Sequence, residues 1–264
     1  MGAYMRASAV FGSAKRIGGI LLPGILLLVA WEVAGRYVLD TEILGEPSNI
    51  LATLVKQAGG TKIWYHLWVT ASEVLIGYFI GVATGFAIGY AVGVSETFGR
   101  IVEPYVLLIN AIPKVAVAPL FIVFFGIGLA SKVAIIVSMV FFLMFYAVYV
   151  GLRTIDAEFL YQARIMGISR TGEIFKIVLP AILPNILVGL KTSAASAIIG
   201  AIIGEIVASR AGLGFYILEA SGSFNVDAIW VGVIFLMLLL FVMTSIIGVL
   251  EWRFLRWLPR KHLG

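Results

Sequence analysis

Five charged residues lie well inside long apolar runs of this chain rather than at their ends, where a charge is most unusual and so most informative about chemistry. They are Glu32, Glu73, Lys114, Lys191 and Glu205. A charge at membrane depth is costly unless it is paired or hydrated, so each is a candidate for binding an ion or a charged solute. Glu205 is the best candidate for facing a pathway or gate, because it lies on a helix rich in small residues, near its outer end.

Four of these residues also have a structural interpretation that the sequence leaves open. Lys191 lies two turns into its run and is long enough to reach water. Lys114 follows a proline and could cap the carbonyl groups of a broken helix. Glu32 and Glu73 could pair with basic residues near the outer surface.

The run that ends at Glu205 carries small side chains at helical spacing. Gly189, Ser193, Ala197, Gly200 and Gly204 recur every three or four residues, which places them on one helix face. Side chains that carry hydroxyl groups lie on or beside this face. The residues that we expect to line a translocation path are Lys114, Ser193, Ser196 and Glu205.

Composition argues against metal and catalytic chemistry. The chain has no Cys and only two histidines, His66 and His262, which are too few for a histidine metal centre or a Ser/His/Asp site. The phosphate-binding pattern G-x-x-x-x-G-K-[ST] is absent from the sequence. We therefore expect no metal site, no cofactor, no catalytic residue and no nucleic-acid partner.

The elements that must position these residues are membrane-spanning helices. Of 264 residues, 61% are hydrophobic and 12% are charged, with a mean hydropathy of +1.07. A span of about 30 Å of hydrocarbon takes ~20 apolar residues. The runs are continuous, as in helices, and predict an all-α integral membrane protein with a retained first helix and a single domain, 1–264. The six runs are roughly 17–39, 68–94, 101–125, 131–152, 183–208 and 229–251.

The placement of Lys and Arg predicts the orientation of these spans. Five of the nineteen basic residues lie at one set of ends: Arg36, Lys56, Lys62, Lys132 and Arg210. Twelve lie at the other set: Arg6, Lys15, Arg16, Arg100, Arg153, Arg164, Arg170, Lys176, Arg253, Arg256, Arg260 and Lys261. The richer set marks the cytoplasm, so both termini and the segment 152–180 are predicted to be cytoplasmic.

Two further patterns concern helix packing. Glycine recurs every four residues along the second run, at Gly77, Gly81, Gly85, Gly89 and Gly93, which favours close helix packing in lipid. We expect this stripe to pack inside one subunit, with a subunit interface as the alternative. Prolines in the third run predict a bent or broken helix. Turn signals outside the spans predict a short helix after GEPSN and an external re-entrant or short-helix segment at 209–228.

The cytoplasmic segment YQARIMGISRTGEIFKIVLP, from Tyr161 to Pro180, is polar and helical in character. Asp156 and Glu158 suit a helix start, Gly167 suits a turn, and Pro180 is expected to end the helix before the next span. In this segment Ala163, Gly167, Ile177, Leu179 and Pro180 fall in register with the EAA loop of bacterial ABC importer permeases, which the segment resembles. Tyr161 and Gln162 depart from that pattern at its front.

Other strings resemble the branch of that family that handles nitrate, taurine, sulfonates and vitamin precursors. They are IPKVAVAPLFIVFFGIG, GLGFYILEASGSFNVDAIWVGVIFL and LEWRFLRW. The resemblance implies the type I importer permease fold in the bacterial inner membrane, and import of a small anionic solute. It also implies a coupling loop at about 153–180, with an ATPase-coupling set of Tyr161, Gln162, Ala163, Gly167, Ile168, Ser169, Arg170, Ile177, Leu179 and Pro180.

The partners implied by the resemblance are a second permease, two cytoplasmic ATPases that hold ATP and Mg, and a periplasmic or lipid-anchored binding protein. Ala163 and Gly167 share a small face that we expect to enter a groove of the ATPase. Two alternatives stay open: a stand-alone secondary transporter or channel with ion sites at Glu205 and Glu73, and a non-transporting scaffold for a sensor. The sequence lacks a convincing internal repeat, which disfavours most secondary transporters.

Overall fold

The computed structural model describes residues 22–37 and 44–256, and the regular structure in these ranges is helical. The predicted cytoplasmic termini, with Arg6, Lys15, Arg16, Arg260 and Lys261, lie outside the described residues. The chain divides into two compact units. One takes in Met1–Thr61 and Ile217–Val231, and the other takes in Lys62–Tyr216 and Gly232–Gly264.

The first unit is built on a helix over residues 22–37 and on α3, Pro47–Ala58. The indole of Trp230 packs on Trp31 with ring centroids 4.8 Å apart, and its Nε1 donates to the carbonyl of Leu44 at 3.3 Å. Glu32 pairs with Arg36 at 2.7 Å, as the structural interpretation of Glu32 predicts. The predicted short helix after GEPSN is confirmed as α3.

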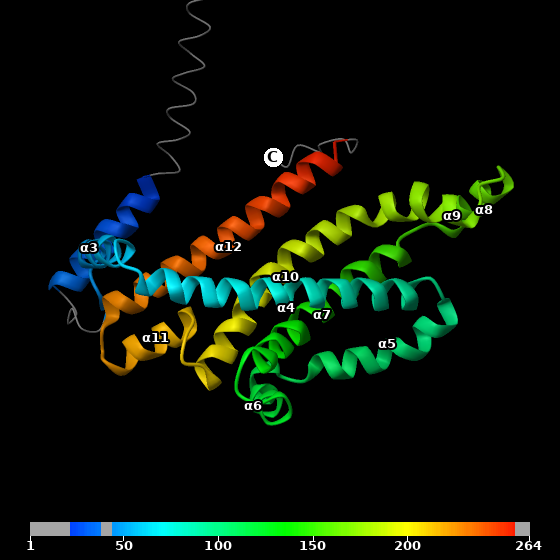
Figure 1. The fold of residues 1–264 in the computed structure, drawn as a ribbon. Helices are drawn as coiled ribbons and strands as arrows, with labels where there is room; N and C mark the ends of the chain where they lie inside the picture. Colours follow the sequence, from blue (N-terminus) through cyan, green and yellow to red (C-terminus); the bar gives the residue numbers. More distant parts are fainter. Residues whose placement is uncertain (1–21, 38–43, 257–264) are drawn as a thin grey trace, which may run out of the picture. The chain divides into compact units, whose positions relative to one another are not determined.

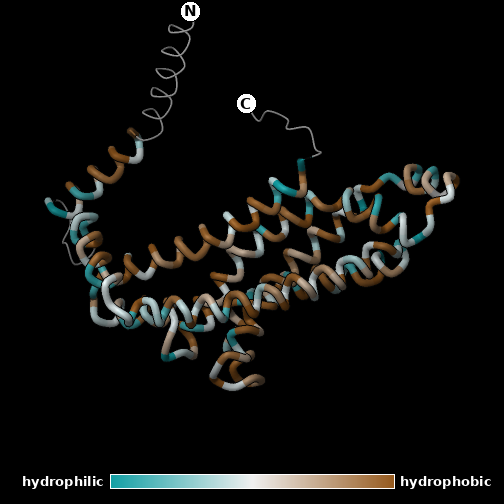
Figure 2. The backbone as a smooth tube through the Cα atoms, turned by 45° about the horizontal axis from the view of Figure 1, so that its top comes forward, coloured by the Kyte–Doolittle hydropathy of each residue, from teal (hydrophilic) through white to brown (hydrophobic). Residues whose placement is uncertain are grey.

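Four described helices are long and apolar enough to cross a membrane, and Figure 2 shows hydrophobic residues along their length. They are α4, Lys62–Gly93; α7, Leu129–Arg153; the continuous helix Arg170–Ala208, whose main part is α10, Leu179–Ala208; and α12, Val226–Phe254. They confirm the second, fourth, fifth and sixth predicted runs. The first run is described only over 22–37.

The third predicted run, 101–125, is a broken pair of helices. α5, Glu96–Ala111, and α6, Lys114–Phe125, meet at an angle of 92°. Ile112 closes α5 and Pro113 precedes α6, both in extended backbone. The break lies at Pro113 because proline disfavours the helical conformation in the residue before it. Pro104 and Pro119 lie within α5 and α6.

α7 packs between α4 and α10 in the second unit (Figure 1). The glycine stripe of α4 makes this contact possible. A Cβ at Gly77 would lie 2.6 Å from Cβ of Ile136, and one at Gly85 would lie 2.6 Å from the carbonyl oxygen of Phe141. Both distances are shorter than real Cβ contacts, so α4 approaches α7 as only glycine allows. The stripe packs inside one chain, as expected.

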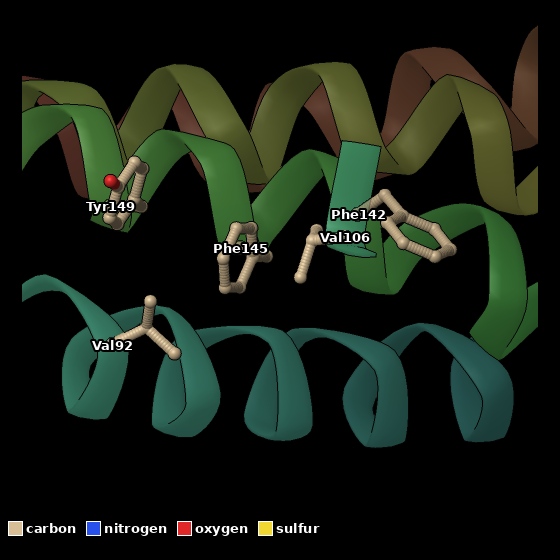
Figure 3. Close-up of a cluster of buried hydrophobic side chains, with 5 residues drawn as sticks. All are labelled: Val92, Val106, Phe142, Phe145 and Tyr149. Carbon is tan, nitrogen blue, oxygen red and sulfur yellow. The ribbon is translucent and has the colours of Figure 1, made fainter. Parts of the chain in front are cut away.

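An aromatic cluster holds α4, α5 and α7 together (Figure 3). Phe145 of α7 is fully buried and stacks on Tyr149 with ring centroids 5.6 Å apart. Val92 comes from α4 and Val106 from α5. The polar end of Tyr149 donates to Oε2 of Glu103 at 2.8 Å. The cluster thereby anchors the middle of α5 on the bundle.

Candidate functional site

The segment between α7 and α10 folds as a short helix, a turn and a helix start. α8, Ala157–Ile165, begins where Asp156 accepts a hydrogen bond from the backbone N–H of Glu158 at 2.9 Å. Such a bond satisfies an N–H that the helix itself cannot pair. The predicted helix start at Asp156 and Glu158 is confirmed.

Gly167 closes α8 with a left-handed turn at φ +79°. The N–H of Ile168 donates back to the carbonyl of Ala163 at 3.2 Å, as in a Schellman C-terminal motif. Ser169 then caps α9, Arg170–Glu173, by accepting from the N–H of Gly172 at 3.2 Å. Gly167 therefore has a conformational role, because a side chain here would strain the backbone.

Pro180 does not end the helix, contrary to expectation. α9 continues through η1, the π-helix Ile174–Val178, into α10, whose first turn holds Leu179 and Pro180. A proline removes one hydrogen-bond donor and crowds the preceding turn. A wider π turn directly before it relieves that crowding, so the helix runs unbroken from Arg170 to Ala208, 39 residues.

α8 presents large apolar side chains outward. Tyr161, Ile165 and Met166 are 64%, 70% and 81% exposed. Ala163 is buried, with 6% exposure, whereas Gly167 is exposed, so only the glycine of the expected small face is open to a partner. Of the other predicted coupling residues, four are exposed and four are partly buried: Gln162, Gly167, Ser169 and Arg170, and then Ile168, Ile177, Leu179 and Pro180.

Both lysines in the predicted spans have partners in the chain. The ammonium of Lys114 donates to the carbonyls of Ile109, Asn110 and Ile112 at 3.0, 2.8 and 3.0 Å, which caps the broken end of α5. The capping interpretation of Lys114 is confirmed. Lys191 of α10 forms an ion pair with Glu251 of α12.

Glu205 is fully buried and holds the loop that follows its own helix. Its Oε1 accepts from the hydroxyl of Thr70 at 2.7 Å, and its Oε2 accepts from the N–H of Gly214 at 2.5 Å. The oxygen of Thr70 accepts from the N–H of Leu213 at 2.7 Å, and Nδ1 of His66 accepts from the N–H of Gly212 at 3.1 Å. Side chains of α4 and α10 thus accept hydrogen bonds from three consecutive backbone amides.

The start of the same loop is held by a buried ion pair. Glu73 of α4 pairs with Lys132 of α7, and Lys132 also donates to Oγ of Ser209 at 3.1 Å. Pairing with a basic residue is the structural interpretation of Glu73, which is confirmed. We call the clamped loop 209–214 the strap; it leads into α11, Leu213–Gly222, the predicted short helix.

The four predicted path residues lie on two helices, Lys114 on α6 and the other three on α10. Ser193 and Glu205 are fully buried within the chain, and Lys114 caps α5. Ser196 is half-buried on α10. The sequence analysis missed His66 and Thr70. Their spacing with Glu73 could have revealed them. His66, Thr70 and Glu73 follow at intervals of four and three residues, which places three polar groups on one face of an apolar helix.

Comparisons with known proteins agree on one family. Residues 74–256 match the family described as "Binding-protein-dependent transport system inner membrane component". The putative aliphatic sulfonates transport permease protein SsuC of Bacillus subtilis is 28% identical, over 92% of this chain and 89% of the relative. The riboflavin transport system permease protein RibX of Chloroflexus aurantiacus is 31% identical, over 90% of each chain.

A third relative and one solved structure are also similar to this chain. The taurine transport system permease protein TauC of Escherichia coli is 27% identical, over 88% of this chain and 86% of the relative. A chain of the MetNI methionine ABC transporter, in an inward-facing structure, superposes with a TM-score of 0.59 at 19% identity. The match covers 71% of this chain and 96% of that one.

Proposed function

Since the chain belongs to the family of binding-protein-dependent transport system inner membrane components, we propose that it works as one of two identical permeases in an ATP-driven importer. It is a multi-pass protein of the inner membrane and a transmembrane permease subunit of an ABC importer with the type I fold. Two cytoplasmic ATPases hold ATP and magnesium, and this chain holds no cofactor. A periplasmic or lipid-anchored binding protein delivers the solute.

The observation that carries this proposal is the helix from Arg170 to Ala208. It begins beside the exposed apolar side chains of α8, and it is long and apolar enough to cross the membrane without a break. A force applied to α8 and α9 by a partner therefore acts on a rigid rod. Such rigid-body transmission is a standard means of switching between two conformational states.

The surface that α8 offers to the ATPase is apolar and bulky. Tyr161, Ile165 and Met166 are exposed in the described chain, and a cytoplasmic segment gains by covering such side chains. Gly167 and Ser169 shape the turn beside them. The coupling set thus divides into residues that contact the partner and residues that hold the loop in shape.

The proposed solute is a small anion of the sulfonate, nitrate or taurine-like class, or a vitamin precursor. The relatives named for aliphatic sulfonates, taurine and riboflavin support this range. Lys114 and Lys191 give no separate support, because both are engaged within the chain. The proposed orientation has both termini and 153–180 in the cytoplasm.

A reconstituted complex tests the proposal. The genes beside that of this chain are expected to encode a P-loop ATPase and a secreted binding protein. Purified together and placed in lipid vesicles, the three proteins should hydrolyse ATP several-fold faster when the binding protein carries its solute. A chain that retains no ATPase, or that moves its solute without ATP, would overturn the proposal.

A further inference from the structure

Two carboxyl groups and one ammonium group are buried together beneath the strap. Glu73, Glu205 and Lys132 are 3%, 0% and 6% exposed, and Lys132 forms an ion pair with Glu73. With both carboxyl groups ionised, the cluster would hold two negative charges against one positive charge. A buried charge without a partner is strongly destabilising, so the cluster needs one more positive charge.

The neighbours of Glu205 among the described residues do not supply that charge. Its two oxygens accept hydrogen bonds from neutral groups, the Thr70 hydroxyl and the N–H of Gly214. His66 of α4 belongs to the same network, but its Nδ1 accepts from a backbone N–H of the strap, which is the arrangement of a neutral imidazole. Arg210 of the strap is exposed to solvent.

An oxygen of Glu73 points to the missing charge. Oε1 of Glu73 pairs with Lys132, whereas Oε2 is buried and has no hydrogen-bond partner among the described residues. The carboxyl group of Glu73 lies within hydrogen-bonding reach of that of Glu205. Two ionised carboxyl groups can only accept and repel each other, but a proton between them makes one of them a donor. Each oxygen of Glu205 has a second lone pair available for such a bond.

We propose that Glu73 and Glu205 form a proton-binding site, in which one shared proton balances the buried charge and keeps the strap in place. When the proton leaves as the pH rises, one unbalanced negative charge remains under the strap, and water must enter to solvate it. The strap is therefore held at lower pH and loosened at higher pH. It lies on the predicted outer side, so the proton exchanges with the outer compartment. The site is built from contacts within this chain and does not rest on the import function.

Infrared spectroscopy detects the proton directly, because a protonated carboxyl group absorbs at a frequency where an ionised one does not. Wild-type permease and Glu73→Gln are purified in dodecyl maltoside, a detergent without a carbonyl group. The wild-type spectrum at mildly acidic pH, minus that of Glu73→Gln, should contain one carboxylic-acid band that moves to lower frequency in D2O. The band should weaken as the pH rises.

Glu73→Gln is expected to fold, because its amide can donate to Glu205 in place of the proton and its carbonyl can still accept from Lys132. Glu251→Gln is the matched control, since it changes the acid partner of Lys191 in the same way, and it should retain the band. If Glu73→Gln does not fold, wild-type spectra at mildly acidic and alkaline pH carry the same test, since exposed carboxyl groups stay ionised over this range.

Hydrogen exchange shows whether the proton holds the strap. Exchange of the amides at 212–214 is followed by mass spectrometry over a series of pH values and divided by the rates of an unfolded peptide of the same sequence. The protection of the wild-type amides should fall at least about tenfold as the proton is lost, because the buried charge is then unbalanced. Glu73→Gln retains His66 and should keep its protection throughout, which separates the proton from any titration of that histidine.

Three outcomes would overturn the proton-binding site. They are a wild-type spectrum that shows no carboxylic-acid band against Glu73→Gln, a band that Glu251→Gln removes equally, and wild-type amide protection that is the same at every pH. The first would mean that Glu73 and Glu205 are both ionised. None of these measurements involves the ATPase or the solute, so the import function is tested separately.

Discussion

At the scale of single residues, two of the charged side chains inside the predicted spans hold backbone in place, and the other three form ion pairs. Lys114 donates hydrogen bonds to the carbonyls at the broken end of α5, and Glu205 accepts a hydrogen bond from a backbone amide of the strap. The sequence could identify both residues as unusual, because charges are rare in apolar runs. It could not identify the partners of Glu205, since Thr70 is 135 positions away and only the packing of α4 against α10 brings them together.

Thr70→Val tests the strap with a side chain of nearly the same shape. The change leaves the carboxylate of Glu205 and the N–H of Leu213 each one partner short in a buried place. Leaving such groups unpaired costs about 1–3 kcal/mol, and more at a charged group. We expect the purified variant to melt several degrees below wild type in detergent.

Thr70→Ser keeps the hydroxyl and serves as the control for that experiment. It should melt within a degree or two of wild type, since the serine hydroxyl can make both hydrogen bonds. Equal melting temperatures for Thr70→Val and wild type would show that the strap is not held through this residue.

At the scale of elements, the apolar runs predict four of the spans, the prolines predict that the third run is bent or broken, and turn signals predict the short helix α3 and a short-helix or re-entrant segment where α11 lies. These features are local, because run length and proline act within a few residues. The continuation of the helix through Pro180 and the burial of Ala163 are not decided by neighbouring residues in the sequence alone. Spacing places Ala163 and Gly167 on one face, but only tertiary packing decides which face of α8 is covered.

The exposed face of α8 leads to a prediction about docking. Met166→Asp places a carboxylate where an ATPase is proposed to cover an apolar side chain. Burying an unpaired charge costs well over the ~1.4 kcal/mol that corresponds to tenfold in affinity. We expect at least about a tenfold drop in the ATPase that copurifies with the permease.

Phe224→Asp is a matched control for Met166→Asp, because both side chains are 81% exposed and Phe224 is on the predicted outer side. Phe224 has a φ of +54°, which aspartate tolerates better than phenylalanine does. The control should keep its full share of ATPase. Retention of the ATPase by Met166→Asp would remove α8 from the docking surface.

At the scale of the whole molecule, the distribution of basic residues predicts which ends of the spans face the cytoplasm. The structure adds that Ser169 and Ser221 are both exposed, so a thiol at either position is open to a reagent on its own side. The termini that carry much of the basic excess lie outside the described residues. Orientation therefore stays a prediction from charge.

Single cysteines measure that orientation in intact cells. Ser221→Cys should react with an impermeant maleimide, and Ser169→Cys should react only after the membrane is permeabilised. The reason is the excess of Lys and Arg at the ends next to Ser169, which stay on the cytoplasmic side during insertion. The opposite labelling pattern would invert the topology and separate 153–180 from any cytoplasmic ATPase.

The π turn of η1 also affects how α10 is rotated about its axis relative to α8. Each residue of an α-helix advances the chain by about 100°, so one residue more between Gly167 and Pro180 would rotate everything beyond it by roughly that angle. The face of α10 that carries Gly189 would then swing away from α7 while α8 stayed where it is. The spacing between Gly167 and Pro180 therefore fixes the rotation of α10 relative to α8. Insertions are tolerable there only in nearly whole helical turns, whereas a single deletion can be absorbed when the π turn of η1 closes to an α turn.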